Sequence, residues 1–261
     1  MNEVELDIRT SDGVADAVLF HSEKLQPAIL HYPDGIGTRP SQRQMARRLA
    51  GEGYTVLLPN IYYRSGRPPF FEGKFDFQNE KTRARFQELT GSLSPDAMDR
   101  DAAAYVDFLA SHPSVGGSKM GVVGYCFTGA MAVRTAAVRP DRIAAAASFH
   151  GGRLVRDDAS SPHLLLPRVK ARLYFGHARD DPSMPAEAIR KLEEALRAQG
   201  GKFESEIYDA DGRCLTARRT TTSARPSART SSFGSCSRQP SADPLSPRFQ
   251  RDRDRDPDRC R

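Results

Sequence analysis

One cysteine of this chain sits in a sequence context that suits nucleophilic catalysis. Cys126 lies within residues 124–129 (GYCFTG), after an apolar run and before a stretch with helical spacing. A tight strand–turn–helix connection projects a nucleophile above the sheet, and glycines on both sides leave room for the turn. The N-terminus of the following helix favours thiolate over thiol. We therefore predict that Cys126 occupies a nucleophile elbow, and the alternative is a small buried residue at a strand end.

Hydrophobic periodicity predicts the elements that must position this cysteine. Apolar runs and alternation indicate strands at 4–10, 16–22, 27–33, 55–60, 119–126, 144–152, 171–181 and 203–210. Helical spacing indicates helices at 43–53, 97–111, 127–138 and 185–201, with Ser41 as the N-cap of the first. Strands that alternate with helices imply an α/β fold with a mainly parallel sheet covered on both faces.

Ligands of such sheets bind at the carboxyl ends of the strands. Gly35, Cys126, His150 and Asp181 all follow predicted strands and should therefore lie at that edge. Residues 64–94 have little periodicity and predict a long irregular insertion, a kind of segment that often lines a site. Its aromatic residues either shape an apolar pocket or pack under the loop: Phe70, Phe71, Phe75 and Phe77. Arg83 or Arg85 either binds a substrate carboxylate or is a solvated helix charge.

Composition excludes several classes of function. The formal net charge is +6, but residues 213–261 contain 12 Arg, no Lys and 5 Asp, which leaves residues 1–212 near neutrality. The body of the chain therefore offers no electrostatic case for nucleic-acid binding. No apolar run approaches the length of a membrane span, and the N-terminal residues lack signal-peptide order, so we expect a cytoplasmic protein without membrane contact. The spacing of the four cysteines predicts neither a disulfide framework nor a zinc site.

Three ordered motifs give the chain a family resemblance that covers about 200 residues. The elbow GVVGYCFTG, the turn HYPDGIG with the later GYTVLLPNIYYR, and the segment YFGHARDDPSMP resemble those of the dienelactone hydrolase family of α/β-hydrolases. The resemblance implies an α/β-hydrolase fold and hydrolysis of small esters, lactones in particular, by cysteine acyl transfer. No metal or organic cofactor is implied.

The resemblance also assigns expected roles to individual residues. Cys126 matches the nucleophile, and Asp181 matches the acid that orients a histidine, with a surface-loop aspartate as the alternative reading. The backbone N–H groups of Phe127 and Gly35 match the oxyanion hole, whose donors are fixed by the fold. Asp34 stands where the family has a glutamate that helps to control the protonation of the thiol, although a turn-forming aspartate is the stronger reading.

The histidine of this triad is missing from its expected place. The resemblance puts it after the last strand, yet residues 211–215 (DGRCL) contain none, and His177 is the last histidine of the sequence. His150, His177 and His31 are the substitutes that remain. We expect each to be a strand-end histidine with its own hydrogen-bond partners, outside the hydrogen-bonding reach that a triad requires. The site therefore reads as an incomplete Cys-Asp-His triad.

The segment 213–261 is rich in Arg, Ser, Thr and Pro and predicts a disordered tail that is foreign to the family. The resemblance predicts a loop and a closing helix there instead. Back-translation of 213–229 with GC-rich codons, read one base out of register, can yield a Pro-Asp-x-Pro loop, a Tyr and an Ala-Glu-Arg-Ala helix like the family's own ending. We therefore hypothesise a frame shift after about residue 210, which the nucleotide sequence tests. A basic nucleic-acid-binding tail is the less favoured alternative, because Arg–Asp alternation is self-neutralising.

The sequence thus predicts an α/β-hydrolase domain over residues 1–212 whose final helix is absent, followed by the tail at 213–261. Loss of that helix leaves one sheet face partly uncovered, so we expect reduced stability and some exposed apolar surface. The expected ligand is a small ester or lactone. Two functions remain open: a hydrolase impaired by the loss of its histidine, or a non-catalytic relative that only binds small molecules.

Overall fold

The structure is a computed structural model that describes residues 1–73 and 75–208. The predicted tail at 213–261, and with it the hypothesis of a frame shift, lies outside the described residues. Within the described part of the chain, no helix is long and apolar enough to cross a membrane.

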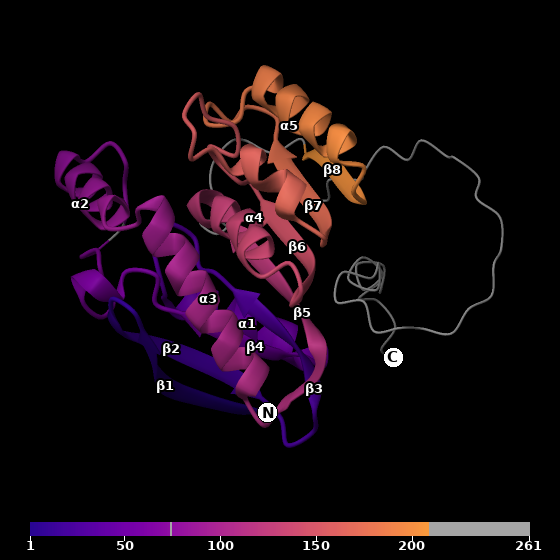
Figure 1. The fold of residues 1–261 in the computed structure, drawn as a ribbon. Coiled ribbons are helices and arrows are strands. Elements are labelled where there is room, and N and C mark those ends of the chain that lie inside the picture. The colour runs from indigo at the N-terminus through magenta and orange to yellow at the C-terminus, as the bar shows by residue number, and fades with distance from the viewer. Residues whose placement is uncertain (74, 209–261) are drawn as a thin grey trace, which may run out of the picture.

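An eight-stranded sheet forms the centre of the molecule (Figure 1), in the order β1-β2-β4-β3-β5-β6-β7-β8. Its strands are β1 (Asn2–Thr10), β2 (Gly13–His21), β3 (Gln26–His31), β4 (Thr55–Pro59), β5 (Val115–Tyr125), β6 (Ile143–Phe149), β7 (Arg172–Ala178) and β8 (Phe203–Tyr208). Strands β1 and β2 pair antiparallel, β2 pairs antiparallel with β4, and the remaining pairs are parallel. The predicted mainly parallel sheet is confirmed.

The two faces of the sheet are covered unequally. Helices α3 (Pro95–Ser111), α4 (Gly129–Val138) and α5 (Ala186–Gln199) pack on one face through the larger apolar core. Helix α1 (Pro40–Gly51) covers the other face, where Ala46 and Ala50 pack against residues of β2, β3 and β4. Burial of these apolar faces is the main source of stability for the layers.

The face that carries α1 continues beyond that helix as a row of aromatic side chains. Tyr125 stacks on Phe149, with ring centroids 5.6 Å apart, and Phe149 lies 5.2 Å from Tyr174. These three side chains are partly buried, and Tyr208 of β8 is 36% exposed. Strand β8 ends at Tyr208, the last residue that the structure describes, so the expected absence of a final helix falls outside the described residues.

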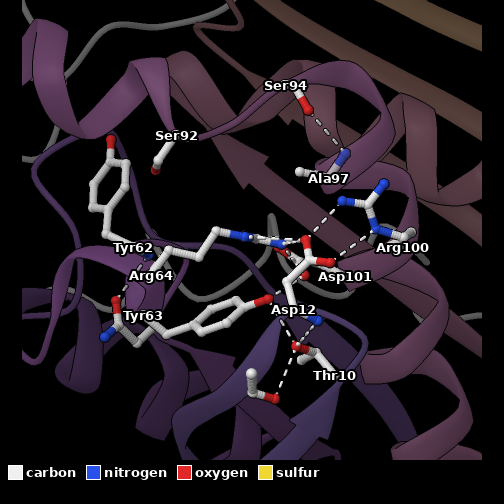
Figure 2. Close-up of polar contacts among 12 residues, drawn as sticks. Thr10, Asp12, Tyr62, Tyr63, Arg64, Ser92, Ser94, Ala97, Arg100 and Asp101 are labelled. Atoms are coloured by element: carbon white, nitrogen blue, oxygen red, sulfur yellow. Dashed lines mark hydrogen bonds and ion pairs between the residues drawn. The ribbon is translucent and has the colours of Figure 1, made fainter.

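Figure 2 shows how the β1–β2 hairpin is joined to α3 by a polar network. Asp101 of α3 is almost fully buried and accepts hydrogen bonds from Tyr63 Oη and from both terminal nitrogens of Arg64, each at 2.8 Å. Arg64 and Arg100 both bond to Asp12 in the hairpin. The side-chain bonds from Arg100 and then Arg64 lower the pKa of Asp12 to about 2. The network fixes the segment that follows β4, which contributes Tyr62 to the site.

Two local expectations were wrong. Arg39, not Ser41, is the N-cap of α1, because the helix begins at Pro40, whose fixed φ suits the first helical position. The insertion after β4 is also not wholly irregular. It contains α2 (Glu80–Gly91), which Asn79 caps by accepting a hydrogen bond from the backbone N–H of Thr82. Only Leu89 of this helix is buried, which explains its weak apolar periodicity.

Candidate active site

Cys126 lies at the end of β5, on a sharp turn that leads into α4. Its φ is +54°, a left-handed conformation that a non-glycine residue rarely adopts. A single 3-10 turn (Cys126–Thr128) connects the strand to the helix. The side chain is partly exposed. The predicted elbow geometry is therefore present: a strained residue at a strand end, just before a helix.

Two glycines make this turn possible. A Cβ atom on Gly124 would lie 2.1 Å from the carbonyl oxygen of Thr128, and one on Gly129 would lie 2.3 Å from Ser148 Oγ. Thr128, the last residue of this turn, has a structural use. Its Oγ1 accepts a hydrogen bond from the backbone N–H of Tyr125 and donates one to the Tyr125 carbonyl. Thr128 thereby ties the two sides of the turn together.

Gly35 and Phe127, the two expected oxyanion-hole residues, lie close together although 92 positions separate them in the sequence. A Cβ on Gly35 would lie 3.4 Å from Phe127 Cβ. Tyr62 holds the loop in place by donating from its hydroxyl to the Gly35 carbonyl at 2.9 Å. Burial, and then the nearby Asp34 and Cys126, raise the pKa of Tyr62, so its hydroxyl stays a neutral donor. Tyr62 lies within the motif GYTVLLPNIYYR, but the sequence assigned it no role, because its bond is to the backbone of a distant residue.

Asp34 is buried in the turn after β3 and is fully engaged in local contacts. One carboxylate oxygen accepts from the Ile36 backbone N–H at 3.0 Å, and Arg39 bonds to both oxygens at 2.6 and 2.7 Å. Gln42 donates a further bond at 3.0 Å. These contacts agree with the reading of a turn-forming aspartate.

Asp181 follows β7 and presents its two carboxylate oxygens to different partners. Oδ1 accepts hydrogen bonds from the backbone N–H of Ser183 at 2.8 Å and from its hydroxyl at 2.7 Å. Oδ2 lies 3.4 Å from Nε2 of His150. Asp181 is buried, so it is not the surface-loop aspartate of the alternative reading. An acid held on one oxygen can orient a histidine through the other.

The contact with His150 corrects our expectation for that residue. We expected a histidine at the same edge of the sheet as Cys126, but with its own hydrogen-bond partners. Instead, His150 is 9% exposed, and within the described residues neither of its ring nitrogens makes a hydrogen bond. The 3.4 Å approach to Asp181 is an electrostatic contact whose geometry is outside that of a hydrogen bond.

His31 and His177 are the two other histidines that the sequence offered as substitutes for the base. His31 Nε2 bonds to Gln42 Oε1 at 3.0 Å, and burial lowers the pKa of His31 to about 4, so its ring is neutral. His177 is buried in β7, its ring stacks 6.1 Å from Phe175, and burial lowers its pKa. Its ring nitrogens make no hydrogen bond to other described residues, so it is also not the hydrogen-bonded histidine that we expected.

An aromatic wall extends outward from the elbow. It consists of Phe127, Phe86, Phe77, Phe75 and Phe71, whose neighbouring ring centroids are 4.7 to 6.4 Å apart in edge-to-face contacts. Phe86 of α2 touches the Gly35 backbone, since a Cβ on that glycine would lie 2.8 Å from the Phe86 ring. Phe77, the middle ring of the wall, is 50% exposed, and Phe71 at its end packs against the apolar core.

Arg83 and Arg85 of α2, the two candidates for binding a substrate carboxylate, are engaged in local contacts. Arg83 donates to the carbonyl oxygens of Phe77 and Gln78, each at 2.9 Å, and Arg85 pairs with Glu88 on the same helix at 2.7 Å. Within residues 1–73 and 75–208, no three His, Cys, Asp or Glu side chains group as metal ligands do.

Comparison with known proteins agrees with this fold and with the strand-end motifs. The sequence model of the Dienelactone hydrolase family matches residues 15–235. The chain belongs to the dienelactone hydrolase family. The resemblance seen in the sequence is thereby confirmed, and an α/β-hydrolase fold with it.

Relatives of this dienelactone hydrolase family member are distant. A candidate carboxymethylenebutenolidase from Salmonella typhi is 27% identical over 203 residues, which cover 75% of this chain and 70% of that protein. The carboxymethylenebutenolidase of Rhodococcus opacus is 26% identical over 186 residues, or 70% of this chain and 68% of that one. A candidate dienelactone hydrolase from Klebsiella pneumoniae has a crystal structure similar in fold, with a TM-score of 0.68, 21% identity and coverage of 79% and 85% of the two chains.

Proposed function

We propose that this chain hydrolyses small neutral esters or lactones through an acyl intermediate on Cys126. The observation that carries the proposal is the left-handed backbone of Cys126 on a turn whose two glycines admit no side chain. Strain of this kind costs on the order of 1–3 kcal/mol and persists at functional sites. A buried structural cysteine would not need it.

Acyl transfer at this site would use the backbone as its electrostatic support. Attack of Cys126 Sγ on a carbonyl carbon moves an electron pair onto the carbonyl oxygen. The backbone N–H groups of Phe127 and Gly35 are the proposed donors to that oxygen, and their closeness supports this role. Asp181 is proposed to orient the base. For Asp34, control of the thiol is the weaker proposal, because Arg39 and Gln42 already bond to its carboxylate.

A second function stays open because the chain has no histidine after its last strand. No histidine follows His177, so the base that the family carries after its last strand is absent from this sequence. Loss of one triad member lowers kcat by several orders of magnitude in well-studied hydrolases. The proposed enzyme is therefore impaired, and the alternative is a relative that only binds small molecules.

The aromatic wall supports a neutral, apolar acyl group. The relatives are named after carboxymethylenebutenolide, a lactone that carries a carboxylate. Arg83 bonds to backbone carbonyl oxygens, and Arg85 pairs with Glu88. The side chains beside the elbow are instead the aromatic rings of Phe127 and Phe86. Burial of an unpaired carboxylate among phenylalanines is unfavourable. We therefore propose that this chain prefers neutral apolar esters to anionic ones.

Hydrolysis of p-nitrophenyl acetate tests the proposed function. The three cysteines outside the described residues also react with this ester, so Cys214, Cys236 and Cys260 are first replaced by Ser in the test background. We expect Cys126→Ala to lose the enzymatic rate of this background, and a chain carrying a histidine-containing family ending to exceed it. Equal rates with and without Cys126 would contradict the enzyme and favour the binding protein.

A cytoplasmic location, which the sequence predicts, stays a prediction.

A further inference from the structure

Cys126 and His150 occupy matching positions on neighbouring strands. Tyr125 at the end of β5 pairs in register with Phe149 at the end of β6. Cys126 is the first residue after β5, and His150 is the first residue after β6. Parallel strands lie about 4.8 Å apart, so the two backbones leave the sheet side by side. Both residues then adopt left-handed conformations, with φ of +54° and +51°.

The segment that follows His150 packs directly on the elbow. The Gly152 backbone N–H donates to the Cys126 carbonyl at 3.3 Å. A Cβ on Gly129 would lie 2.7 Å from Gly151 Cα, so the start of α4 touches the same segment. The His150 backbone N–H bonds to the Gly176 carbonyl at 2.7 Å, which anchors this residue to β7 on its other side.

The side chain of His150 has one charged neighbour and unused bonding capacity. Asp181 Oδ2 is 3.4 Å from its Nε2, and no hydrogen bond to another described residue uses Nδ1 or Nε2. A buried ring nitrogen without a partner is costly, and a catalytic task is one explanation for it. Strands β5 and β7 flank β6, and besides Asp181 the titratable residues at their matching ends are Cys126 after Tyr125 and His177 after Gly176.

From these contacts we infer that His150 is the base for Cys126 in this chain, in place of the histidine that the family carries after its last strand. This inference rests on the proposed function. It makes β6 the source of the base, with Asp181 as the orienting acid.

The proposed steps conserve protons. A ring nitrogen of His150 takes the Sγ proton, and Sγ bonds to the ester carbonyl carbon. As the tetrahedral intermediate collapses, the carbon–oxygen bond to the alcohol breaks, and the imidazolium returns the proton to that oxygen. Water then attacks the thioester, gives its proton to His150, and the acid leaves as Sγ regains its proton. Asp181 stabilises the imidazolium in both halves.

Alkylation of Cys126 by iodoacetamide tests the inference without requiring turnover. In the background whose tail cysteines are Ser, the alkylation rate is measured from pH 5 to 10 for the parent and for His150→Asn. Asn tolerates the left-handed backbone, so the strand end is kept. His163→Asn is the matched control, because His163 is also buried but lies in the 3-10 segment Pro162–Arg168. We expect His150→Asn to slow alkylation at pH 7 at least about tenfold and to move the midpoint of the profile to higher pH, with His163→Asn unchanged.

Chemical rescue gives a second readout if His150→Asn is poorly folded. Gly is unstrained at a positive φ, so His150→Gly keeps the backbone and leaves space for free imidazole. Imidazole should raise p-nitrophenyl acetate hydrolysis of His150→Gly several-fold more than that of His163→Asn. Unchanged alkylation profiles together with no selective rescue would overturn the inference. Failure of the proposed function has a different signature, because Cys126→Ala would then hydrolyse the ester as fast as the parent.

Discussion

Cys126 and His150, at the ends of the neighbouring strands β5 and β6, share a left-handed backbone and are held together by the bond from the Gly152 N–H to the Cys126 carbonyl. Each such residue costs roughly 1–2 kcal/mol relative to an ordinary conformation. Strain at two adjacent strand ends is hard to explain by packing alone. The strain at these two positions agrees with a site in which the ends of β5 and β6 place the nucleophile and the base.

The elbow should not tolerate a side chain at Gly124. A Cβ there would lie 2.1 Å from a backbone oxygen, which no rotamer change can relieve. Gly124→Ala should lower the free energy of unfolding by about 2–4 kcal/mol and abolish any esterase rate. Gly91→Ala is the matched control, because nothing lies within 4 Å of its Cβ position at the end of α2. Urea unfolding measures both, and equal midpoints would contradict the crowded turn.

Mild acid should destabilise the fold through its buried histidines. Burial lowers the pKa of His31 to about 4 from an ordinary value of 6.5, although Gln42 and Asp34 oppose the shift. Between pH 6.5 and 4 the unfolded chain therefore binds a proton that the folded chain does not. Stability should fall as the pH decreases through this window, by on the order of 3 kcal/mol for His31. Burial also lowers the pKa of His177, in the same direction.

Denaturant unfolding at a series of pH values checks this dependence. His31→Asn carries no titrating ring, so its stability should change less between pH 6.5 and 4 than that of the parent. Parallel curves for the two chains would show that His31 does not carry the effect.

In the network of Figure 2, the buried Asp101 should contribute more to the free energy of unfolding than the exposed Arg100. Asp101→Ala leaves Arg64 without its buried partner, and we expect a loss of about 2–3 kcal/mol, near the lower bound for a broken buried pair because Arg64 is 16% exposed. Arg100→Ala removes an exposed contact to Asp12 and should change little. Similar losses in thermal unfolding for both variants would contradict this ranking.

The aromatic wall should set the preference for the acyl group. We expect the parent to react faster with p-nitrophenyl hexanoate than with the p-nitrophenyl monoester of glutaric acid, which carries a carboxylate. Phe86→Ala removes the ring between Phe127 and Phe77 and should reduce this ratio of kcat/KM values about tenfold, since a buried phenyl group contributes roughly 1–3 kcal/mol. Leu164→Ala, at an exposed position away from the wall, is the control. A preference for the anionic ester would point to a substrate carboxylate site instead.

The sequence predicted the strands, the elbow and the family well, because apolar periodicity and the glycines around Cys126 act locally. It failed where the determinant is a contact between distant residues. The 3.4 Å approach of His150 to Asp181 depends on the register of β5, β6 and β7, which no short motif encodes. Helix α2 was missed because a mostly exposed helix has little apolar periodicity, and Tyr62 because its only role in the site is a bond to a backbone carbonyl.

Detection of the acyl intermediate tests the central claim most directly. The chain with its tail cysteines replaced by Ser is mixed with p-nitrophenyl acetate, quenched in acid after short intervals, digested and analysed by mass spectrometry. The account predicts one acetyl group, on the peptide that contains Cys126, which appears with the first release of p-nitrophenol and is absent from Cys126→Ala. Release of p-nitrophenol at the parent rate by Cys126→Ala, or acetylation only at other residues, would contradict it.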